Sequence, residues 1–141
     1  MEFSEEKYTE MLEKLFLRFP SFQKAGASAY KPGIANMEFI DQLMGHPHRN
    51  YDIIHVAGTN GKGSTCRYIY CALQAAGYKT GLYISPFIEV FNERIEAGGA
   101  YISDEDLAKY TDRVLAQVKV MTDAGHQSPT EFEVITAVAF L

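Results

Sequence analysis

The stretch HVAGTNGKGST, residues 55–65, constrains the fold of this chain more than any other part of it. It holds three glycines, one lysine and several small hydroxyl and amide side chains. The preceding run is almost continuously apolar through Ile53, Ile54, Val56 and Ala57, which predicts a short strand buried on both faces of a parallel sheet. Beyond the glycines, apolar residues recur at helical spacing up to Gly77, a suitable helix terminator; they are Cys66, Ile69, Ala72, Leu73 and Ala76.

The order strand, glycine loop, helix predicts a phosphate-binding loop. Such a turn presents free backbone N–H groups and the positive end of a helix dipole to one point, and glycines let an anion approach the backbone closely. Lys62 adds a full positive charge. Val56 and Gly63 depart from the strict P-loop pattern, which requires a glycine and a hydroxyl there. Cys66 stands where a dinucleotide fingerprint would need its third glycine, so NAD is excluded.

Helices are predicted on both sides of this loop. Ser4 would cap a helix with an apolar stripe formed by Tyr8, Met11, Leu12, Leu15 and Phe16. Asn36 would cap a short helix that ends at Gly45. Ser103 and Asp106 would open a third, with Leu107, Tyr110, Val114 and Val118 on one face. Ser128, Pro129 and Glu131 fit the N-cap, N1 and N3 positions of the last helix.

A second strand is predicted in KTGLYIS, residues 79–85, and residues 86–102 are interpreted as an extended loop. A right-handed crossover through the intervening helix would make this strand parallel to the first. The expected fold class is therefore α/β, a P-loop NTPase-like three-layer arrangement around a parallel sheet.

Charge and hydropathy limit the partners. The net charge of −5 argues against a general nucleic-acid binder or a binder of anionic membranes. No apolar run approaches the ~18 residues of a membrane span. The acidic N-terminus lacks the apolar segment of a signal peptide, so we expect a cytoplasmic protein.

The cysteines and histidines predict no metal site. Cys66 and Cys71 lie five apart on one predicted helix, a spacing that suits neither CxxC chemistry nor zinc, and they are interpreted as packing residues. His46 and His48 are assigned to a loop because proline separates them and no third ligand is in register. His55 is expected to be buried in a strand, and His126 to lie in a polar turn.

HVAGTNGKGS resembles the ATP loop of the folylpolyglutamate synthase and dihydrofolate synthase family, within the Mur-ligase-like superfamily. The resemblance continues in AAGYKTGLYISPF, FNERI and PTEFEVITA, and upstream in KPGIANM and GHPHRNYDIIHV. These motifs cover most of residues 29–138. The resemblance implies that the chain is the N-terminal part of a Mur-ligase-like ATP-binding domain. Residues 1–50 would then form a helical approach to the substrate, and residues 51–141 an incomplete P-loop core.

The family resemblance also implies roles for particular residues. ATP would be bound by Gly58, Thr59, Asn60, Gly61, Lys62, Gly63, Ser64 and Thr65, with Lys62 as the catalytic charge. Ser85 would be a ligand of Mg²⁺. The folate substrate would contact Tyr30, Lys31, Phe87, Arg94, Thr130 and Phe132.

Simpler structural roles remain open for the same residues. Ser85 could begin a turn before Pro86, and Lys31 could be solvated. Arg94 could pair with Glu93 or Glu96 at the surface while Phe87 and Phe91 anchor the loop. Glu131, inside the TEF motif, could simply cap its helix.

The implied reaction is ATP-dependent amide formation, in which a carboxylate of dihydropteroate or of a folate is phosphorylated and the amine of L-glutamate displaces phosphate. The family has further metal ligands and a C-terminal glutamate ligase domain beyond the equivalent of Leu141. We therefore expect the 141 residues alone to be inactive and to self-associate, whereas the whole synthase would be monomeric. The residues themselves leave open another P-loop phosphoryl-transfer enzyme or a non-catalytic nucleotide-binding module.

Overall fold

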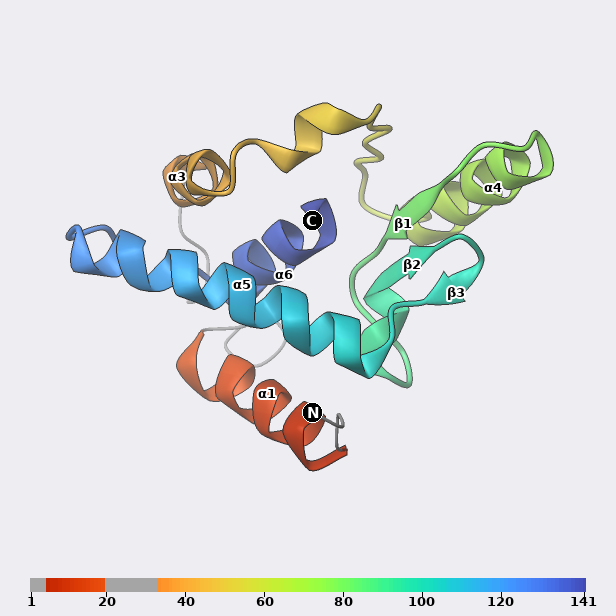
Figure 1. Ribbon diagram of the computed structural model, residues 1–141. Helices are drawn as coiled ribbons and strands as arrows, with labels where there is room; N and C mark the ends of the chain where they lie inside the picture. The colour runs from red at the N-terminus through yellow and green to blue at the C-terminus, as the bar shows by residue number, and fades with distance from the viewer. Residues whose placement is uncertain (1–4, 20–32) are drawn as a thin grey trace. The chain divides into compact units, whose positions relative to one another are not determined.

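The computed structural model describes residues 5–19 and 33–141, and the chain divides into two compact units (Figure 1). The first unit comprises Met1–Tyr51 and Asp104–Leu141, and the second comprises Asp52–Ser103. None of the helices in the described ranges is both long and apolar enough to cross a membrane. Predictions for Ser4, Tyr30 and Lys31 fall outside the described residues.

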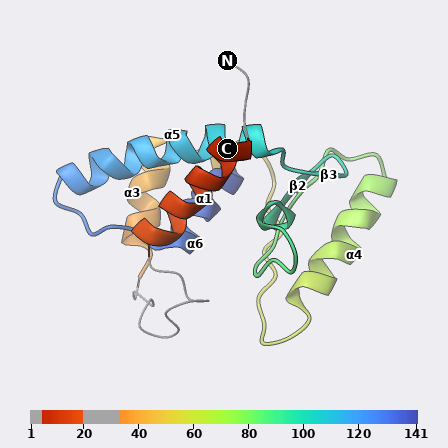
Figure 2. The ribbon, with the colours of Figure 1, turned by 90° about the horizontal axis from the view of Figure 1, so that it is seen from below.

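The first unit is helical. Its elements are α1 (Glu5–Arg18), α3 (Ala35–Leu43), the 3-10 helix η2 (Pro47–Asn50), α5 (Asp104–Asp123) and α6 (Glu131–Phe140). Helices α1, α3 and α6 all lie against the long helix α5, as both views show (Figures 1 and 2). The core of the unit is apolar and includes Met11, Leu15, Phe19, Ile40, Leu107, Val114, Val118, Met121, Val134, Ile135 and Val138. The predicted apolar stripes of α1 and α5 supply five of these side chains, Met11, Leu15, Leu107, Val114 and Val118.

Two predicted helix caps are wrong. The residue before α3 is Ile34, which makes no side-chain cap bond, and Asn36 lies within the first turn. At α6 the capping box consists of Thr130 and Glu133 rather than Ser128 and Glu131. The Thr130 hydroxyl accepts the Glu133 N–H at 3.2 Å, and the Glu133 carboxylate accepts the Thr130 N–H at 2.7 Å. Both pairs match the same four-residue pattern, and the second is adjacent to the apolar run that the helix buries.

The second unit contains α4 (Lys62–Ala75), β1 (Gly81–Tyr83), the 3-10 helix η3 (Phe91–Arg94), β2 (Ile95–Ala97) and β3 (Ala100–Tyr101). Helix α4 ends at Ala75, and Gly77, the predicted terminator, follows its C-cap with a φ of +87°. The Gly77 N–H donates to the Gln74 carbonyl and the Tyr78 N–H to the Leu73 carbonyl, which is a Schellman motif. Helix α4 lies against β1.

The predicted parallel sheet is wrong. The three strands form one antiparallel sheet in the order β1-β2-β3, so the chain is α/β only in the broad sense of helices with a small sheet. Residues 52–57 form neither helix nor strand, and they join none of the strands in the described ranges. A strand requires a hydrogen-bonded neighbour, and β1 instead pairs with β2, the next extended segment along the chain.

The expected extended loop at residues 86–102 contains η3 and a hairpin. Gly98 and Gly99 join β2 to β3 in a two-residue turn, with φ values of +63° and +91°. Positive φ at both positions is what a type I′ hairpin turn requires, and glycine adopts it without strain. The Gly-Gly pair between apolar segments was the sequence signal for this hairpin.

Several predicted burial patterns in this unit are also wrong. Ile53 and Ile54 are 51% and 59% exposed, and His55 is exposed as well, because no sheet covers the segment. Cys71 is exposed and Cys66 half-buried. The buried residue of α4 is Tyr70, which lay outside the predicted stripe. Its hydroxyl accepts the Gly99 N–H at 2.8 Å and so attaches the helix to the hairpin turn.

Candidate functional site

The glycine loop at residues 58–65 forms the amino end of α4, as the sequence predicts. Gly58 and Gly61 have φ values of +154° and +77°, which favour glycine, and Gly61 is the N-cap. The Thr65 N–H donates to the Gly61 carbonyl at 2.9 Å. The amides of Lys62, Gly63 and Ser64 precede this first helical bond and have no intrahelical acceptor. They are exposed at the positive end of a fourteen-residue helix, where an anion is stabilised.

Lys62 folds back over this loop. Its ammonium group donates to the Gly58 carbonyl at 2.6 Å and to the Thr59 carbonyl at 3.3 Å. The side chain is exposed, so a phosphate could reach it from solvent. The loop therefore combines backbone donors with one mobile positive charge, which is the chemistry that binds polyphosphate.

Ser85, Phe87 and Arg94 lie in one closed loop of the second unit. The Ile84 N–H donates to the Arg94 carbonyl at 2.9 Å and closes its base. Ser85 is exposed, and its peptide bond to Pro86 is cis. The Phe87 ring is half-buried and makes an edge contact with the Phe91 ring, with centroids 5.5 Å apart.

Arg94 is only 3% exposed. Its guanidinium group donates to the Tyr83 hydroxyl at 3.3 Å and lies 5.1 Å from the centre of the Phe91 ring. The alternative of a surface ion pair with Glu93 or Glu96 is not what the structure has. The Glu93 carboxylate accepts backbone N–H groups, and the Glu96 carboxylate pairs with Arg67.

An ion pair between Arg67 and Glu96 was not predicted from the sequence. The Arg67 Nη1 and Glu96 Oε2 atoms are 2.5 Å apart, and Glu96 is 6% exposed. The hydrogen bond to Glu96 raises the pKa of the Arg67 guanidinium group. The guanidinium carbon also lies 5.5 Å from the centre of the Tyr70 ring, and burial raises the pKa of that phenol. This network joins α4 to β2 across 29 residues, a separation that no local sequence pattern reveals.

The remaining predicted substrate residues lie in the first unit. Thr130 is the N-cap of α6, and Phe132 is 50% exposed in the first turn of the same helix. Glu131, which the sequence assigned to the cap, is instead buried at the first helical position.

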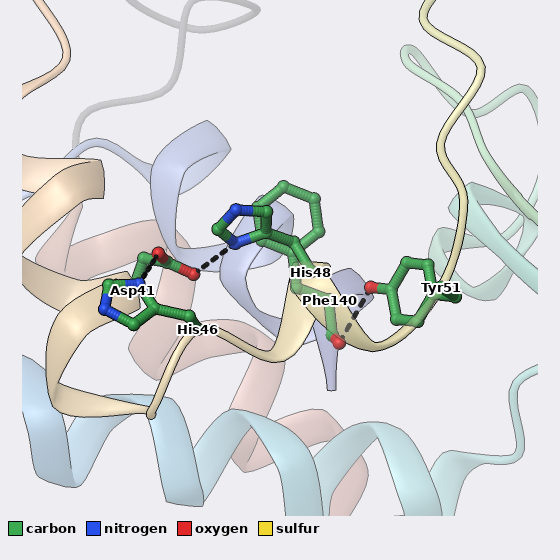
Figure 3. Close-up of polar contacts among 5 residues, drawn as sticks. All are labelled: Asp41, His46, His48, Tyr51 and Phe140. Carbon is green, nitrogen blue, oxygen red and sulfur yellow. Dashed lines mark hydrogen bonds and ion pairs between the residues drawn. The ribbon is translucent and has the colours of Figure 1, made fainter.

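The first unit also contains a histidine cluster formed by Asp41, His46 and His48 (Figure 3). The Asp41 carboxylate lies 2.5 Å from Nδ1 of His46 and 2.7 Å from Nδ1 of His48. Burial of Asp41 alone would raise the pKa of its carboxyl, but the hydrogen bonds from the two histidines outweigh it and hold that pKa below its usual value. The two rings approach Asp41 from opposite sides.

Around this cluster, Tyr51 donates its hydroxyl hydrogen to the Phe140 carbonyl at 2.9 Å, and the His48 ring lies 5.6 Å from the Phe140 ring. The contacts join the turn after α3 to the end of α6. Within residues 5–19 and 33–141, no group of three or more His, Cys, Asp or Glu side chains is arranged to hold a metal ion. The cluster was missed because the Gly45 turn, with φ of +77°, brings His46 back toward α3.

Comparison with known proteins gives matches over most of the sequence. A dihydrofolate synthase/folylpolyglutamate synthase from Bacillus subtilis is 44% identical over 111 residues, which cover 79% of this chain and 26% of that protein. A folylpolyglutamate synthase from Lacticaseibacillus casei is 41% identical over 98 residues, which cover 69% of this chain and 23% of that protein. The chain therefore spans about a quarter of the length of these curated relatives. No family model matches the sequence.

Solved structures agree with the sequence matches. The crystal structure of a folylpolyglutamate synthase from Thermotoga maritima matches with a TM-score of 0.81 at 34% identity, over 94% of this chain and 29% of that chain. A structure described as a complex of such a synthase with AMPPCP and folate matches with a TM-score of 0.79 at 36% identity, over 94% of this chain and 31% of that chain. The similarity therefore extends through both units as well as the glycine loop.

Proposed function

We propose, from its homology to the folylpolyglutamate synthase/dihydrofolate synthase family, that this chain binds ATP and part of the folate substrate for an ATP-dependent glutamate ligase. The observation that carries the proposal is the glycine loop, where exposed backbone donors and Lys62 meet at the amino end of α4. The related synthase complexed with AMPPCP and folate supports both ligands.

In the proposed reaction the γ-phosphoryl group of ATP passes to a carboxylate oxygen of a folate or of dihydropteroate, giving an acyl phosphate and ADP. The amine nitrogen of L-glutamate then attacks the acyl carbon, phosphate leaves with the C–O bond electrons, and the nitrogen loses a proton to form the amide. Residues 58–65 would bind the β- and γ-phosphates, and Lys62 would neutralise the charge that grows between them. Catalysis by these residues is positioning and electrostatic stabilisation, without a protein nucleophile.

The donors of this unit fit Mg²⁺ only when the ion is bound together with a nucleotide, whose phosphates would supply further ligands. Mg²⁺ prefers oxygen ligands and is held in many phosphate sites by one or two protein groups, substrate phosphates and water. Ser85 is exposed after β1, and Ser64 and Thr65 begin α4, so hydroxyl oxygens are the ligands that this unit would offer. The ion would supply positive charge to the phosphate oxygens.

For the folate side, we propose that Phe87 of the second unit covers an aromatic ring of the substrate. Thr130 and Phe132 at the start of α6, in the first unit, are proposed separately as substrate contacts. Phe87 is only half-buried and Phe132 is 50% exposed, so both aromatic residues are accessible to a flat ligand. Arg94 would stabilise this loop from its buried side, because its guanidinium group already contacts Tyr83 and Phe91.

The experiment is calorimetric titration of the chain with AMPPCP, with and without MgCl₂, followed by titration with folate. We expect AMPPCP binding that tightens with Mg²⁺, and a Ser85→Ala variant in which Mg²⁺ has a smaller effect. Ser128→Ala, which removes an exposed hydroxyl in the other unit, is the matched control and should behave like the wild type. Absence of AMPPCP binding at millimolar concentration would contradict the proposal.

A further inference from the structure

The loop between Ile84 and Arg94 is held at two levels. At its base, the Ile84 N–H donates to the Arg94 carbonyl at 2.9 Å. Inside it, the backbone N–H groups of Ile88, Glu89 and Val90 all donate to the carboxylate of Glu93, at 2.9, 3.0 and 3.0 Å. One side chain therefore satisfies three consecutive amides.

These three bonds use both carboxylate oxygens. Oε2 accepts from Ile88, and Oε1 accepts from both Glu89 and Val90. The N–H groups of Ile88, Val90 and Glu89 hold the pKa of the Glu93 carboxyl below its usual value, which indicates that the charged form is the one they bind. A neutral amide in its place has one acceptor oxygen and turns an NH₂ group toward at least one of the donors.

The anchoring matters because the segment has little else to fix it. Ile88 is 89% exposed and Val90 is half exposed, so neither apolar side chain is buried in a core. Phe87, next to Ile88, keeps its ring against Phe91, which is buried in η3 two positions before Glu93. The Glu93 carboxylate therefore fixes the backbone of residues 88–90, and the Phe91 ring contacts Phe87 at the start of the same segment.

We propose that Glu93 is a positioning residue for the folate side of the site, where it sets the conformation of residues 87–90 and thereby the placement of the Phe87 ring. The inference rests on the proposed function for its substrate. Glu93 itself contacts no substrate in this assignment. Its effect is transmitted through the three amides and the Phe87 and Phe91 ring contact.

The test compares Glu93→Gln with Glu89→Gln, a neighbouring exposed glutamate, so that both variants lose one negative charge from the same loop. Calorimetry would measure folate and AMPPCP affinity for each. We expect Glu93→Gln to weaken folate binding about tenfold and to change AMPPCP affinity less than twofold, because the glycine loop lies outside residues 87–90. Glu89→Gln should leave both affinities at the wild-type level.

A second measurement reports on the loop without substrate. In the wild type, the amide protons of Ile88, Glu89 and Val90 should exchange slowly and should shift together in NMR spectra as pH falls below about 4.5, the ordinary pKa of a glutamate. In Glu93→Gln this common titration should disappear. If the Gln variant folds poorly, Glu93→Asp takes its place, since it keeps the charge but shortens the side chain. We expect Glu93→Asp to lose folate affinity by less than the tenfold expected for Glu93→Gln.

The outcomes separate the two proposals. Wild-type folate affinity in a Glu93→Gln variant that has lost the amide titration would overturn the positioning role and leave the proposed function intact. Failure of the wild-type chain to bind folate while it binds AMPPCP would overturn the folate side of the proposed function, and the positioning role with it. Equal loss of folate and AMPPCP affinity would show a general structural effect and would also overturn the inference.

Discussion

Nδ1 of His48 lies 2.7 Å from Oδ1 of Asp41, although seven residues and a glycine turn separate them in the chain. Asp41 is 8% exposed, and its other carboxylate oxygen, Oδ2, is hydrogen-bonded to Nδ1 of His46. A carboxylate can accept both Nδ1–H groups from neutral imidazoles, so the arrangement requires no histidine charge. It holds the segment that leads from α3 toward Tyr51.

Asp41→Asn should destabilise the first unit by about 1–2 kcal/mol at pH 7, because an amide cannot accept from both imidazoles. The folded-state pKa of Asp41 is lowered, so its contribution is present above the ordinary value of 3.8 and is lost as pH falls through the folded-state pKa. Urea unfolding followed by circular dichroism at pH 7, 5 and 3 would measure this. The difference between wild type and variant should be smaller at pH 3 than at pH 5.

Asp123→Asn is the control for Asp41, because Asp123 makes an exposed ion pair with Lys119 at 2.6 Å. Its removal should cost less than about 0.5 kcal/mol. Equal effects of the two substitutions would contradict the role assigned to the histidine cluster.

Lys62→Ala should weaken AMPPCP binding by about tenfold, equivalent to ~1.4 kcal/mol, since it removes the positive charge that folds over the glycine loop. Calorimetry at fixed ionic strength would measure the change. Lys79→Ala removes an exposed lysine of the same unit outside the loop and should have little effect. If both substitutions reduced affinity equally, the loss would reflect overall charge rather than a specific contact.

Arg67 and Glu96 should be energetically coupled. Glu96 is buried, so removing Arg67 leaves a carboxylate with poor solvation, but the Arg67 side chain is 38% exposed and solvent screens part of the attraction. A double-mutant cycle with Arg67→Ala and Glu96→Gln should give a coupling free energy of about 1 kcal/mol. Thermal unfolding of the four proteins measures it, and additive effects would show that the pair contributes only packing.

Gly98 and Gly99 should respond differently to substitution. At Gly98, φ of +63° suits asparagine, so Gly98→Asn should be neutral or slightly stabilising. At Gly99, φ of +91° is unfavourable for any side chain, although a Cβ there would make only an ordinary contact, 3.5 Å from Nε2 of Gln74. Gly99→Ala should therefore lower stability by about 1 kcal/mol or more in thermal unfolding. The reverse order of the two variants would contradict the turn geometry.

Helices were the predictable part of this fold, because their apolar spacing is local. Leu15 and Val114, from the stripes predicted for α1 and α5, are buried in the core, and Gly77 follows the end of α4 as expected. The sheet was not predictable in the same way, because pairing depends on which extended segments meet. The apolar run at Ile53 and Ile54 fits a buried strand, yet both residues are exposed. The strand β1, which was expected to lie beside this run, pairs with β2 instead.

The same distinction between local and long-range contacts applies to the candidate site. The glycine loop was predictable because its donors come from consecutive residues, Gly58 to Thr65. The supports of the neighbouring segments were not, because they join distant residues, as in the bond from Arg67 to Glu96. Glu93 was open to prediction as the third residue of a short helical turn, but from the sequence it was interpreted only as a partner for Arg94.

The bonds from Lys62 to the Gly58 and Thr59 carbonyls bear on the entropy of nucleotide binding. A lysine side chain has about 2 kcal/mol of rotamer freedom to lose. Here much of that freedom is already restricted by the loop, so an incoming phosphate would exchange acceptors for the ammonium group rather than immobilise a freely rotating chain. Encounter with a polyphosphate would then require only a short displacement of the ammonium group, which favours fast association and affinity differences expressed mainly in the dissociation rate.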